Sequence, residues 1–334
     1  MGAVVACFGE LLLRFAASDG STLRDMNKLD VHVGGAEANV AVALANLGIP
    51  TRMISTLPNN ALGTLALKAI KRESVDTSHV RTGEGRMGLY FFTPAAGPRG
   101  GEIVYDRAGS AFAALDAVDS ALLDGASHLH VSGISLAVSE ASSFATRTLA
   151  KQAKEHGLTL SFDGNYRPSL WEASGRRGRD EIAEMVGLAD VFFGNHKDAS
   201  LILGREFSGD GGSRRREAAL ALLGDFPSLQ LVSSTARHIE NGTTHRIVAR
   251  VDSREEAAET AERTLTGIVD RIGTGDAFAA GVLASWLADP DDLQAAVDGG
   301  AALAALKHYE QGDFCRASRA EWMAAMGGLS DVSR

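Results

Sequence analysis

The chain has 334 residues, of which 45 % are hydrophobic and 22 % charged, a balance that excludes a mainly disordered protein. Its formal net charge is −9, which argues against nucleic acid or an anionic membrane as a partner; a phosphate would need a local site. Only two cysteines are present, and no stretch reaches the roughly 18 apolar residues of a membrane span. We therefore expect a cytoplasmic protein without disulfides.

Short apolar runs alternate with helical patterns along most of the chain. The predicted strands cover 4–8, 51–56, 128–132, 158–163, 191–194 and 230–234. The predicted helices cover 37–47, 62–73, 140–156, 180–188, 218–223, 276–287 and 293–308. Such alternation predicts right-handed crossovers and a mainly parallel sheet with helices on both faces. The expected fold class is α/β, with three layers arranged α/β/α.

Two segments, at about 12–33 and 86–108, break this alternation. Both have strand patterns separated by polar, glycine-rich turns, with no helix between them. Within the second, 89–93 and 102–105 predict a hairpin around Gly97–Gly101. We expect the two segments to form a small β-sheet that covers one edge of a single domain spanning residues 1–334.

Three other patterns carry little functional weight. Gly83–Gly88 matches G-x-G-x-x-G, but a strand pattern follows it, whereas a dinucleotide site needs a helix there. His128 and His130 share one face of a strand, but no further ligands lie at metal-site spacing. The basic run Arg214–Arg216 is expected in a solvated loop.

The segment from Asp270 to Asp276 is the sharpest local feature, because its glycines directly precede a predicted helix. Gly273 and Gly275 permit a tight turn and leave backbone N–H groups uncovered, and the helix N-terminus adds positive potential. These groups predict an anion site that uses no lysine. An aspartate there repels phosphate, so Asp276 makes sense as a base that takes a proton from an attacking hydroxyl. Read alone, the segment also fits a plain N-cap.

A second feature is the run Gly34-Gly35-Ala36-Glu37-Ala38-Asn39, which leads directly into the helix 37–47. Its glycines let a ligand approach the backbone, although an ordinary strand-to-helix turn has the same pattern. Together, this run, Leu47-Gly48 and the 270–278 segment resemble the two signatures of the PfkB (ribokinase-like) family of sugar kinases. The resemblance covers about residues 3–325. The segments 9–14, 105–111, 162–171 and 305–314 are most similar to its 2-keto-3-deoxygluconate kinases.

The resemblance implies roles for particular residues. Asp276 is the implied general base, and Gly273, Thr274 and Gly275 form the implied anion hole. The implied substrate contacts are Gly34, Gly35, Ala36, Glu37, Ala38, Tyr90, Tyr105, Arg107, Arg167 and Asp313. The implied ATP contacts are Asn165, Arg167, Asn195, Ser233, Thr235, Gly273 and Gly275. ATP and Mg²⁺ are the implied cofactors, with Asp198 acting on the metal indirectly; whether a monovalent cation is needed is left open.

Two departures from the family pattern concern the nucleotide side of the site. A glycine-containing turn usually follows the strand predicted to end at Ser234, but this chain has Thr235–Ile239 without glycine, which puts the adenine contacts in doubt. The family's Asn-x-x-Glu motif resembles Asn195–Asp198, with the shorter aspartate in place of glutamate.

The expected function is transfer of the ATP γ-phosphoryl group to the terminal hydroxyl of 2-keto-3-deoxygluconate. Arg107 and Arg167 favour an acidic sugar, because planar guanidinium groups bind carboxylates in a bidentate way. A fructokinase, a ribokinase or a 2-keto-3-deoxygalactonate kinase is the nearest alternative. A non-catalytic sugar-binding protein, indicated only by the unusual 235–239 turn, and a dinucleotide enzyme are more distant. Self-association through the small β-sheet is expected from the resemblance.

Overall fold

The computed structural model describes residues 4–18, 20–115 and 118–328. Its body is one large sheet in the order β13-β12-β11-β10-β9-β8-β1-β4-β5, with β14 also paired to β12. From β11 to β5 every neighbouring pair is parallel, and only the additions beyond β11 are antiparallel. These strands are β1 (Val4–Phe8), β4 (Thr51–Pro58), β5 (Asp76–Gly83), β8 (Ala126–Ser132), β9 (Thr159–Asp163), β10 (Val191–Phe193), β11 (Leu231–Asn241), β12 (Thr244–Asp252), β13 (Ala257–Glu259) and β14 (Arg263–Thr266).

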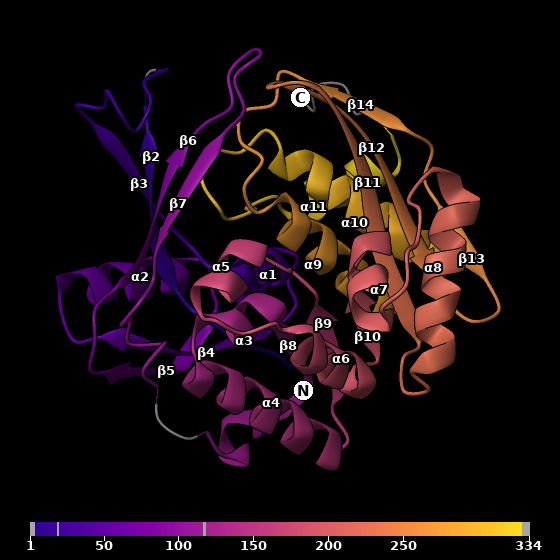
Figure 1. The fold of residues 1–334 in the computed structure, drawn as a ribbon, viewed down its shortest axis with the longest axis horizontal. Helices are drawn as coiled ribbons and strands as arrows, with labels where there is room; N and C mark the ends of the chain where they lie inside the picture. Colours follow the sequence, from indigo (N-terminus) through magenta and orange to yellow (C-terminus); the bar gives the residue numbers. More distant parts are fainter. Residues whose placement is uncertain (1–3, 19, 116–117, 329–334) are drawn as a thin grey trace.

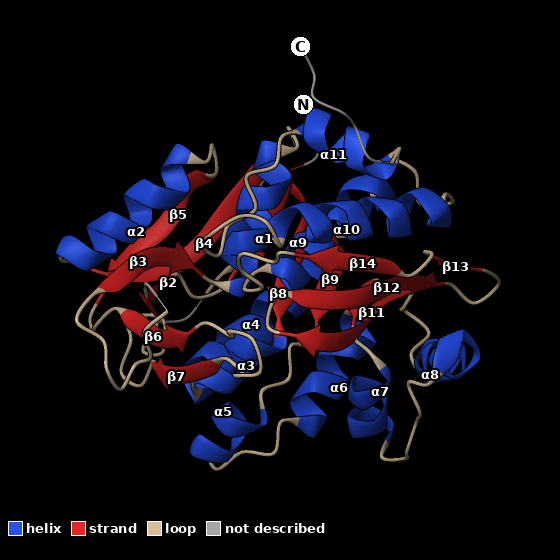
Figure 2. Cartoon of the chain, turned by 90° about the horizontal axis from the view of Figure 1, so that it is seen from above, coloured by secondary structure: helices blue, strands red, loops and turns tan. Residues whose placement is uncertain are grey.

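Helices cover both faces of this sheet, so the expected three-layer α/β/α arrangement is confirmed (Figure 2). One face carries α1 (Ala36–Asn46), α2 (Ala61–Arg72), α9 (Thr274–Trp286), α10 (Leu293–Lys307) and α11 (Arg319–Met326). The other carries α3 (Gly133–Val138), α4 (Glu140–Glu155), α5 (Pro168–Ala173), α6 (Arg179–Leu188), α7 (His196–Leu203) and α8 (Gly211–Asp225). Two hydrophobic cores, one on each side, contain the residues that these helices bury.

Close packing of α9 against α10 depends on small residues. A Cβ at Gly281 would lie 2.3 Å from the carbonyl oxygen of Gly299, so the two backbones touch there. The Trp322 indole N–H closes the contact by donating to the same carbonyl at 2.8 Å. This packing joins α9 to α10 and α11 on one face of the main sheet.

A second sheet of order β3-β2-β6-β7 forms the predicted small β-sheet, here called the lid (Figure 1). Its strands are β2 (Leu12–Ala17), β3 (Leu29–Gly34), β6 (Gly88–Thr93) and β7 (Glu102–Asp106). β6 and β7 pair antiparallel, as the predicted hairpin requires, whereas β2 and β6 pair in parallel. The lid projects from the body beside α2.

The register of the lid separates polar and apolar side chains onto its two faces. Arg14 pairs with His32 on one side and Tyr90 on the other, and Tyr90 pairs with Tyr105, so one residue from each strand forms a polar row. The adjacent residues form the apolar row Val31, Phe15, Phe91 and Val104. Successive strand side chains point to opposite faces, so the two rows lie on opposite faces of the lid.

Two expectations for the part of the chain that forms α8 and β11 were wrong. The strand expected to end at Ser234 continues to Asn241, because Thr235 to Ile239 pair with β12 in a long antiparallel ladder. The expected turn at 235–239 is therefore a strand, and its lack of glycine is ordinary. The run Arg214–Arg216 lies on α8, where Arg215 is buried and contacts Glu259 at 2.9 Å.

Candidate active site

The carboxyl ends of the central parallel strands, the N-termini of α1 and α9 and the polar face of the lid define the candidate site. In open α/β sheets, ligands bind outside the carboxyl ends of the strands. Here β8 ends at Ser132 and β9 at Asp163, while α9 begins at Thr274. The two sequence features identified above, far apart in the chain, meet at this edge through Asn39 and Asp276.

Asp276 lies in the first turn of α9 and is held by Asn39, whose Nδ2 donates to the Asp276 carboxylate at 2.6 Å. Burial raises the pKa of Asp276 to about 7, opposed by the Asn39 hydrogen bond and reinforced by the charge of Glu37. A carboxylate with such a pKa suits proton abstraction near neutral pH better than one near 4. The sequence had placed Asn39 in a signature but had not identified it as the residue that orients the base.

The glycines before Asp276 have different structural reasons. Gly273 has φ +82°, and a Cβ there would lie 2.1 Å from the Asp313 carbonyl oxygen, so the fold itself requires glycine. A Cβ at Gly275 would meet nothing within 4 Å among the described residues, so packing does not require glycine there. The Thr274 N–H donates to the Arg271 carbonyl at 3.4 Å, whereas Gly275 is exposed and its N–H, like that of Asp276, lies in the first turn of α9, where N–H groups have no partner within the helix. Such a helix N-terminus is the geometry of an anion site.

A group of acids lies beside Asp276 at the ends of β9 and β10. Burial, followed by the charge of Asp276, raises the pKa of Asp163 to about 8, while Arg167 opposes the shift. Burial likewise raises the pKa of Asp198, whose Oδ1 lies 3.3 Å from the position of a Cβ on Gly164. Sequence reasoning missed Asp163, although the strand that ends in an acid was itself a usable signal.

The residues expected to contact ATP line this same edge, with different degrees of exposure. Asn165 has a left-handed backbone (φ +38°) and donates its N–H to Asp163 at 3.0 Å, a strained position of the kind found at binding sites. Arg167 follows it at the start of α5 and is exposed. Ser233 is buried, with no partner for its hydroxyl among the described residues, and Thr235 is exposed on β11.

Asn195 and Asp198 form a capping box at the start of α7. Asn195 Oδ1 accepts from the Lys197 N–H at 2.8 Å, and Asp198 Oδ2 accepts from the Asn195 N–H at 2.8 Å. This motif stabilises a helix N-terminus. Because Asp198 Oδ2 is used in the capping box, Oδ1 is the oxygen of Asp198 that faces Gly164, and the charge of Asp198 acts on Asp163.

Arg14 joins the lid to the body, a role that sequence reasoning missed. Its guanidinium contacts Asp270 at 2.6 Å and Asp313 at 3.2 Å, and all three side chains are buried. Asp313 also accepts a hydrogen bond from the Tyr90 hydroxyl at 2.5 Å, while the Tyr105 ring lies 6.1 Å from that of Tyr90. Burial and the neighbouring Asp313 raise the pKa of Tyr90, so it is a donor here.

Arg107 follows the lid strand β7 and forms a buried ion pair with Glu10. Its Nε donates to Glu10 at 2.7 Å, and Nη2 contacts the same oxygen at 2.5 Å. A Cβ at Gly88 would lie 2.2 Å from the other Glu10 oxygen, so this glycine makes room for the carboxylate. Arg107 Nη1 is buried without a hydrogen-bond partner among the described residues.

The run from Gly34 to Ala38 has structural explanations that differ from the expected one. A Cβ at Gly34 would lie 2.1 Å from Asp313 Oδ2, and one at Gly35 would lie 2.1 Å from the Glu10 carbonyl oxygen. Ala36 is only partly buried at the start of α1. Glu37 and Ala38 are buried in this conformation, and their expected contact with the sugar stays a prediction.

Glu37 organises the floor of the site. One of its carboxylate oxygens accepts from the Ser132 N–H at 3.1 Å, the Ser132 hydroxyl at 2.9 Å and the Ser135 hydroxyl at 2.6 Å. Burial raises the pKa of Glu37 despite these donors. The contacts connect the N-terminus of α1 to the carboxyl end of β8.

Several buried polar atoms of this network lack hydrogen-bond partners among the described residues. They come from the lid and from the body: Glu10 Oε1, Arg14 Nη1, Asn39 Oδ1, Arg107 Nη1 and Asp313 Oδ1. Buried polar groups in proteins are nearly always paired. Glu10 contacts Arg107, Arg14 contacts Asp313 and Asn39 contacts Asp276, so the atoms belong to three separate contacts of the candidate site. Donors and acceptors are both present among them, which suits a polar ligand that has groups of both kinds.

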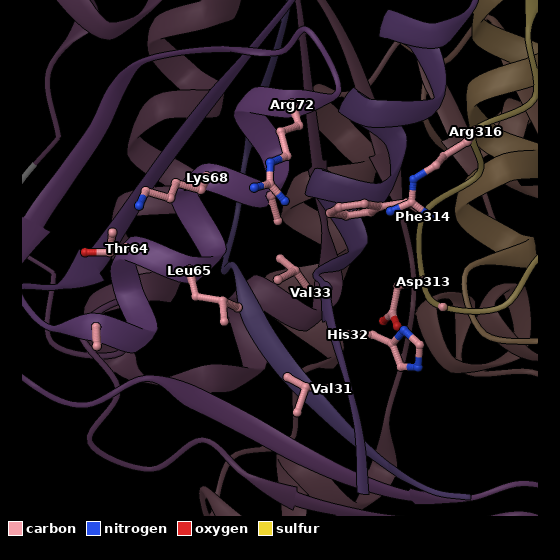
Figure 3. Close-up of a pocket in the computed structure, with 13 residues that line it drawn as sticks. Val31, His32, Val33, Thr64, Leu65, Lys68, Arg72, Asp313, Phe314 and Arg316 are labelled. Atoms are coloured by element: carbon pink, nitrogen blue, oxygen red, sulfur yellow. The ribbon is translucent and has the colours of Figure 1, made fainter.

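A cavity of about 630 Å³ lies next to this network, between β3, α2 and the segment 312–316 (Figure 3). Asp313 and His32 lie together on one wall, and Lys68, Arg72 and Arg316 project from the others. Asp313 is the one residue of its lining that was expected to contact the substrate. The cavity therefore adjoins the candidate site at Asp313 and does not contain Asp276.

Two negative findings apply to the described part of the chain. Within residues 4–18, 20–115 and 118–328, no three or more His, Cys, Asp or Glu side chains cluster as metal ligands. No helix among those residues is long and apolar enough to cross a membrane.

Comparisons with known proteins agree with the site. Residues 3–313 match the model of the pfkB family of carbohydrate kinases. The chain is 31 % identical to a 2-dehydro-3-deoxygalactonokinase of Haloferax volcanii over 94 % of its length and 93 % of that protein's. It is 30 % identical to a 2-dehydro-3-deoxygluconokinase of Bacillus subtilis, covering 92 % and 90 %. The structure of a 2-dehydro-3-deoxygluconokinase of Thermotoga maritima superposes with a TM-score of 0.92 at 31 % identity, covering 98 % of this chain and all of that one. A match of this extent shows that the chain belongs to the PfkB family of carbohydrate kinases.

Proposed function

We propose that this kinase transfers the γ-phosphoryl group of ATP to the terminal hydroxyl of 2-keto-3-deoxygluconate, the compound also named 2-dehydro-3-deoxygluconate. The observation that carries the proposal is that Asp276 lies at the open N-terminus of α9 and that Glu37 connects it to Arg107, whose Nη1 has no partner among the described residues. The charge of Glu37 acts on Asp276, and the charge of Arg107 acts on Glu37. A sugar acid supplies a hydroxyl group for Asp276 and a carboxylate for Arg107. The Bacillus and Thermotoga relatives are named for this substrate.

In the proposed mechanism, Asp276 takes the proton of the hydroxyl as its oxygen attacks phosphorus. The N–H groups of residues 273–276 bind the phosphoryl oxygens, on which charge develops in the transition state. Asn39 keeps the Asp276 carboxylate oriented, and Arg14 and Tyr90 hold the lid against the body through Asp313. A closed lid excludes water, which limits hydrolysis of ATP. The kinase thus acts as one domain with the lid as a part of it.

Magnesium is the metal expected in such a reaction, and Asp163 and Asp198 fit it. Both are oxygen donors with raised pKa values, so a nearby cation would relieve the mutual repulsion that opposes their ionisation. The described residues hold no larger ligand cluster, so phosphate oxygens and water would complete the coordination. When bound, the metal neutralises charge on the phosphate oxygens.

The proposed substrate is tested by a coupled assay of ADP release with purified enzyme. The panel is 2-keto-3-deoxygluconate, its galactonate epimer, fructose and ribose. We expect kcat/KM to be highest for an acid, by about tenfold or more over the neutral sugars, because each charged hydrogen bond contributes about 1.5–3 kcal/mol. The Asp276→Asn variant, prepared in parallel, reports contaminating kinases. Equal or faster turnover of fructose or ribose would contradict the acid substrate.

The galactonate epimer is the second candidate, because the Haloferax relative is named for it. The two acids differ in configuration at one carbon, so the same arginine serves both. If kcat/KM is higher for the galactonate epimer than for the gluconate, the assignment moves to that substrate and the phosphoryl-transfer site is unchanged. The expected cytoplasmic location stays a prediction.

We also propose that copies of the chain associate through the apolar row of the lid. Val31 and Val104, at its ends, are each 47 % exposed, and the Phe15 and Phe91 rings stack between them with centroids 5.5 Å apart. An apolar row of this kind is typical of an interface. Light scattering after gel filtration should give a dimer or larger species, and a Val31→Lys, Val104→Lys variant should be monomeric. Phe144→Lys, at a 61 % exposed position on α4, is the matched control. A monomeric wild-type protein at assay concentrations would rule this surface out.

A further inference from the structure

Lys307, the last residue of α10, is a buried charge that the proposed mechanism does not use. Its side chain is 0 % exposed, although lysine is rarely fully buried without a charged partner. Nζ donates to the carbonyl oxygen of Glu310 at 2.8 Å. It forms no ion pair with any residue within the described ranges. A buried ammonium held mainly by a carbonyl group requires a further explanation.

The side chain lies directly beneath the turn that opens the anion hole. A Cβ at Gly273 would be 3.4 Å from Lys307 Cε, so the lysine stem packs against this turn from the interior. The next residue, His308, accepts at its carbonyl oxygen from the N–H groups of Val269 at 2.9 Å and Asp270 at 3.2 Å. The end of α10 and the 269–273 segment are therefore joined, with Lys307 at the centre of the contact.

The charges around Lys307 are mostly negative. Asp270, Glu310 and Asp313 attract its ammonium, whereas Arg14 repels it, and burial lowers its pKa. Arg14 already contacts both Asp270 and Asp313. Without Lys307, three carboxylates would face one guanidinium immediately behind a site that binds phosphate. Such an excess of negative charge weakens the binding of an anion.

We propose that Lys307 is a positioning residue whose ammonium acts as a resident cation behind the Gly273–Asp276 loop. It holds the Gly273 turn in place and offsets the carboxylates, so that the loop binds the phosphates of ATP without an added monovalent cation. This inference rests on the proposed phosphate site, and it deepens that proposal. It also modifies the prediction that the anion site uses no lysine. Lys307 comes from a different helix, α10, and supports the loop from the interior without belonging to the loop itself.

Three substitutions separate the charge from the hydrogen bond. Lys307→Gln keeps an N–H donor for the Glu310 carbonyl but has no charge, Lys307→Arg keeps the charge, and Lys71→Gln removes the same charge from the exposed face of α2. We expect Lys307→Gln to raise both the Kd for a non-hydrolysable ATP analogue and the KM for ATP about tenfold, with the KM for sugar within about twofold. Lys307→Arg should keep most of the affinity, and Lys71→Gln all of it. Wild-type affinity in a folded Lys307→Gln protein would overturn the proposal.

Ammonium ions provide a second test, because they can replace the missing group in Lys307→Ala. Added ammonium chloride should restore nucleotide affinity to Lys307→Ala several-fold, whereas the larger tetramethylammonium ion should not. Wild-type enzyme in tetramethylammonium buffer should bind the analogue equally well with and without potassium or ammonium. Strong activation of the wild type by either ion would overturn the proposal even if no variant folds. Nucleotide binding is measured without sugar, so a wrong substrate assignment would not affect this result.

Discussion

Replacing Asp276 with asparagine is expected to lower kcat by about 10²–10⁴-fold, the usual contribution of a positioned general base. Asparagine has nearly the same shape and still offers an oxygen to Asn39, whose Nδ2 lies 2.6 Å from the present carboxylate. It cannot accept the proton of the attacking hydroxyl. The variant should therefore fold normally and bind sugar and ATP, as checked by thermal unfolding and calorimetry. Asp289→Asn, at an exposed position after α9, is the matched control.

The pH dependence provides a second measure of the same role. The pKa of Asp276 is raised to about 7, chiefly by burial, and the reactive form is the ionised one. Activity should thus be full above this pKa and decrease as the pH falls through about 7, whereas an ordinary aspartate would retain activity down to about pH 4. The profile of kcat/KM for the sugar, at saturating Mg²⁺ and ATP, shows this acid limb. An Asp276→Asn enzyme with near-wild-type turnover would show that the base is another group.

Alanine substitutions at Gly275 and at Gly273 should affect different properties, although the two glycines are separated by one residue. The first should lower activity, and the second should lower stability. A methyl group at Gly275 meets no protein atom within 4 Å among the described residues, and alanine favours a helix more than glycine does. The Gly275→Ala protein should therefore be as stable as the wild type. The methyl group occupies the approach to the α9 N–H groups, however. We expect kcat/KM for ATP to fall by about 10²–10³-fold, as when one donor is removed from an oxyanion hole.

Gly273→Ala should instead destabilise the fold. Its φ of +82° disfavours any side chain, and the new Cβ would lie 2.1 Å from the Asp313 carbonyl oxygen. We expect the free energy of unfolding to fall by about 2–4 kcal/mol, measured by urea denaturation. Steady-state kinetics and unfolding of both variants separate the two effects. Wild-type kcat/KM in Gly275→Ala would show that the phosphates do not bind at this helix end.

Local pattern was sufficient to predict most of the parallel strands of the main sheet and to single out Asp276 as the candidate base. The apolar run at 4–8 is buried β1, and the predicted helix at 140–156 begins at the Ser139 capping box and ends within a residue of the prediction. These elements are determined by residues close together in the chain. β5, β12, β13 and β14 were not predicted. β11 has a pattern that looks like a strand end and a turn, because its second half is exposed and its pairing with β12 is not encoded locally.

The roles that residues acquire from their tertiary contacts could not be derived from local sequence patterns. Arg14, Asp163 and Lys307 are ordinary charged residues in the sequence. Each has a neighbour far along the chain that the sequence pattern does not reveal: Asp270 for Arg14, Asp276 for Asp163 and the Gly273 turn for Lys307. Glu37, which is expected to contact the sugar, accepts hydrogen bonds from two serines at another strand–helix junction, and no local pattern indicates these partners. A charge's effect depends on its burial and its neighbours, neither of which is a property of one segment.

The alternation of strand and helix patterns thus determined the fold class, and the two glycine-rich runs carried the resemblance to the kinase family and the prediction of an anion site, because glycine geometry and helix ends are local properties. Tertiary structure decided how those parts work together. It placed Asn39 on Asp276, connected the lid to the body through Arg14 and put a lysine behind the anion hole. A net charge of −9 is compatible with binding two anions because buried cations act over a few ångströms, where neighbouring side chains outweigh the sum over the whole chain.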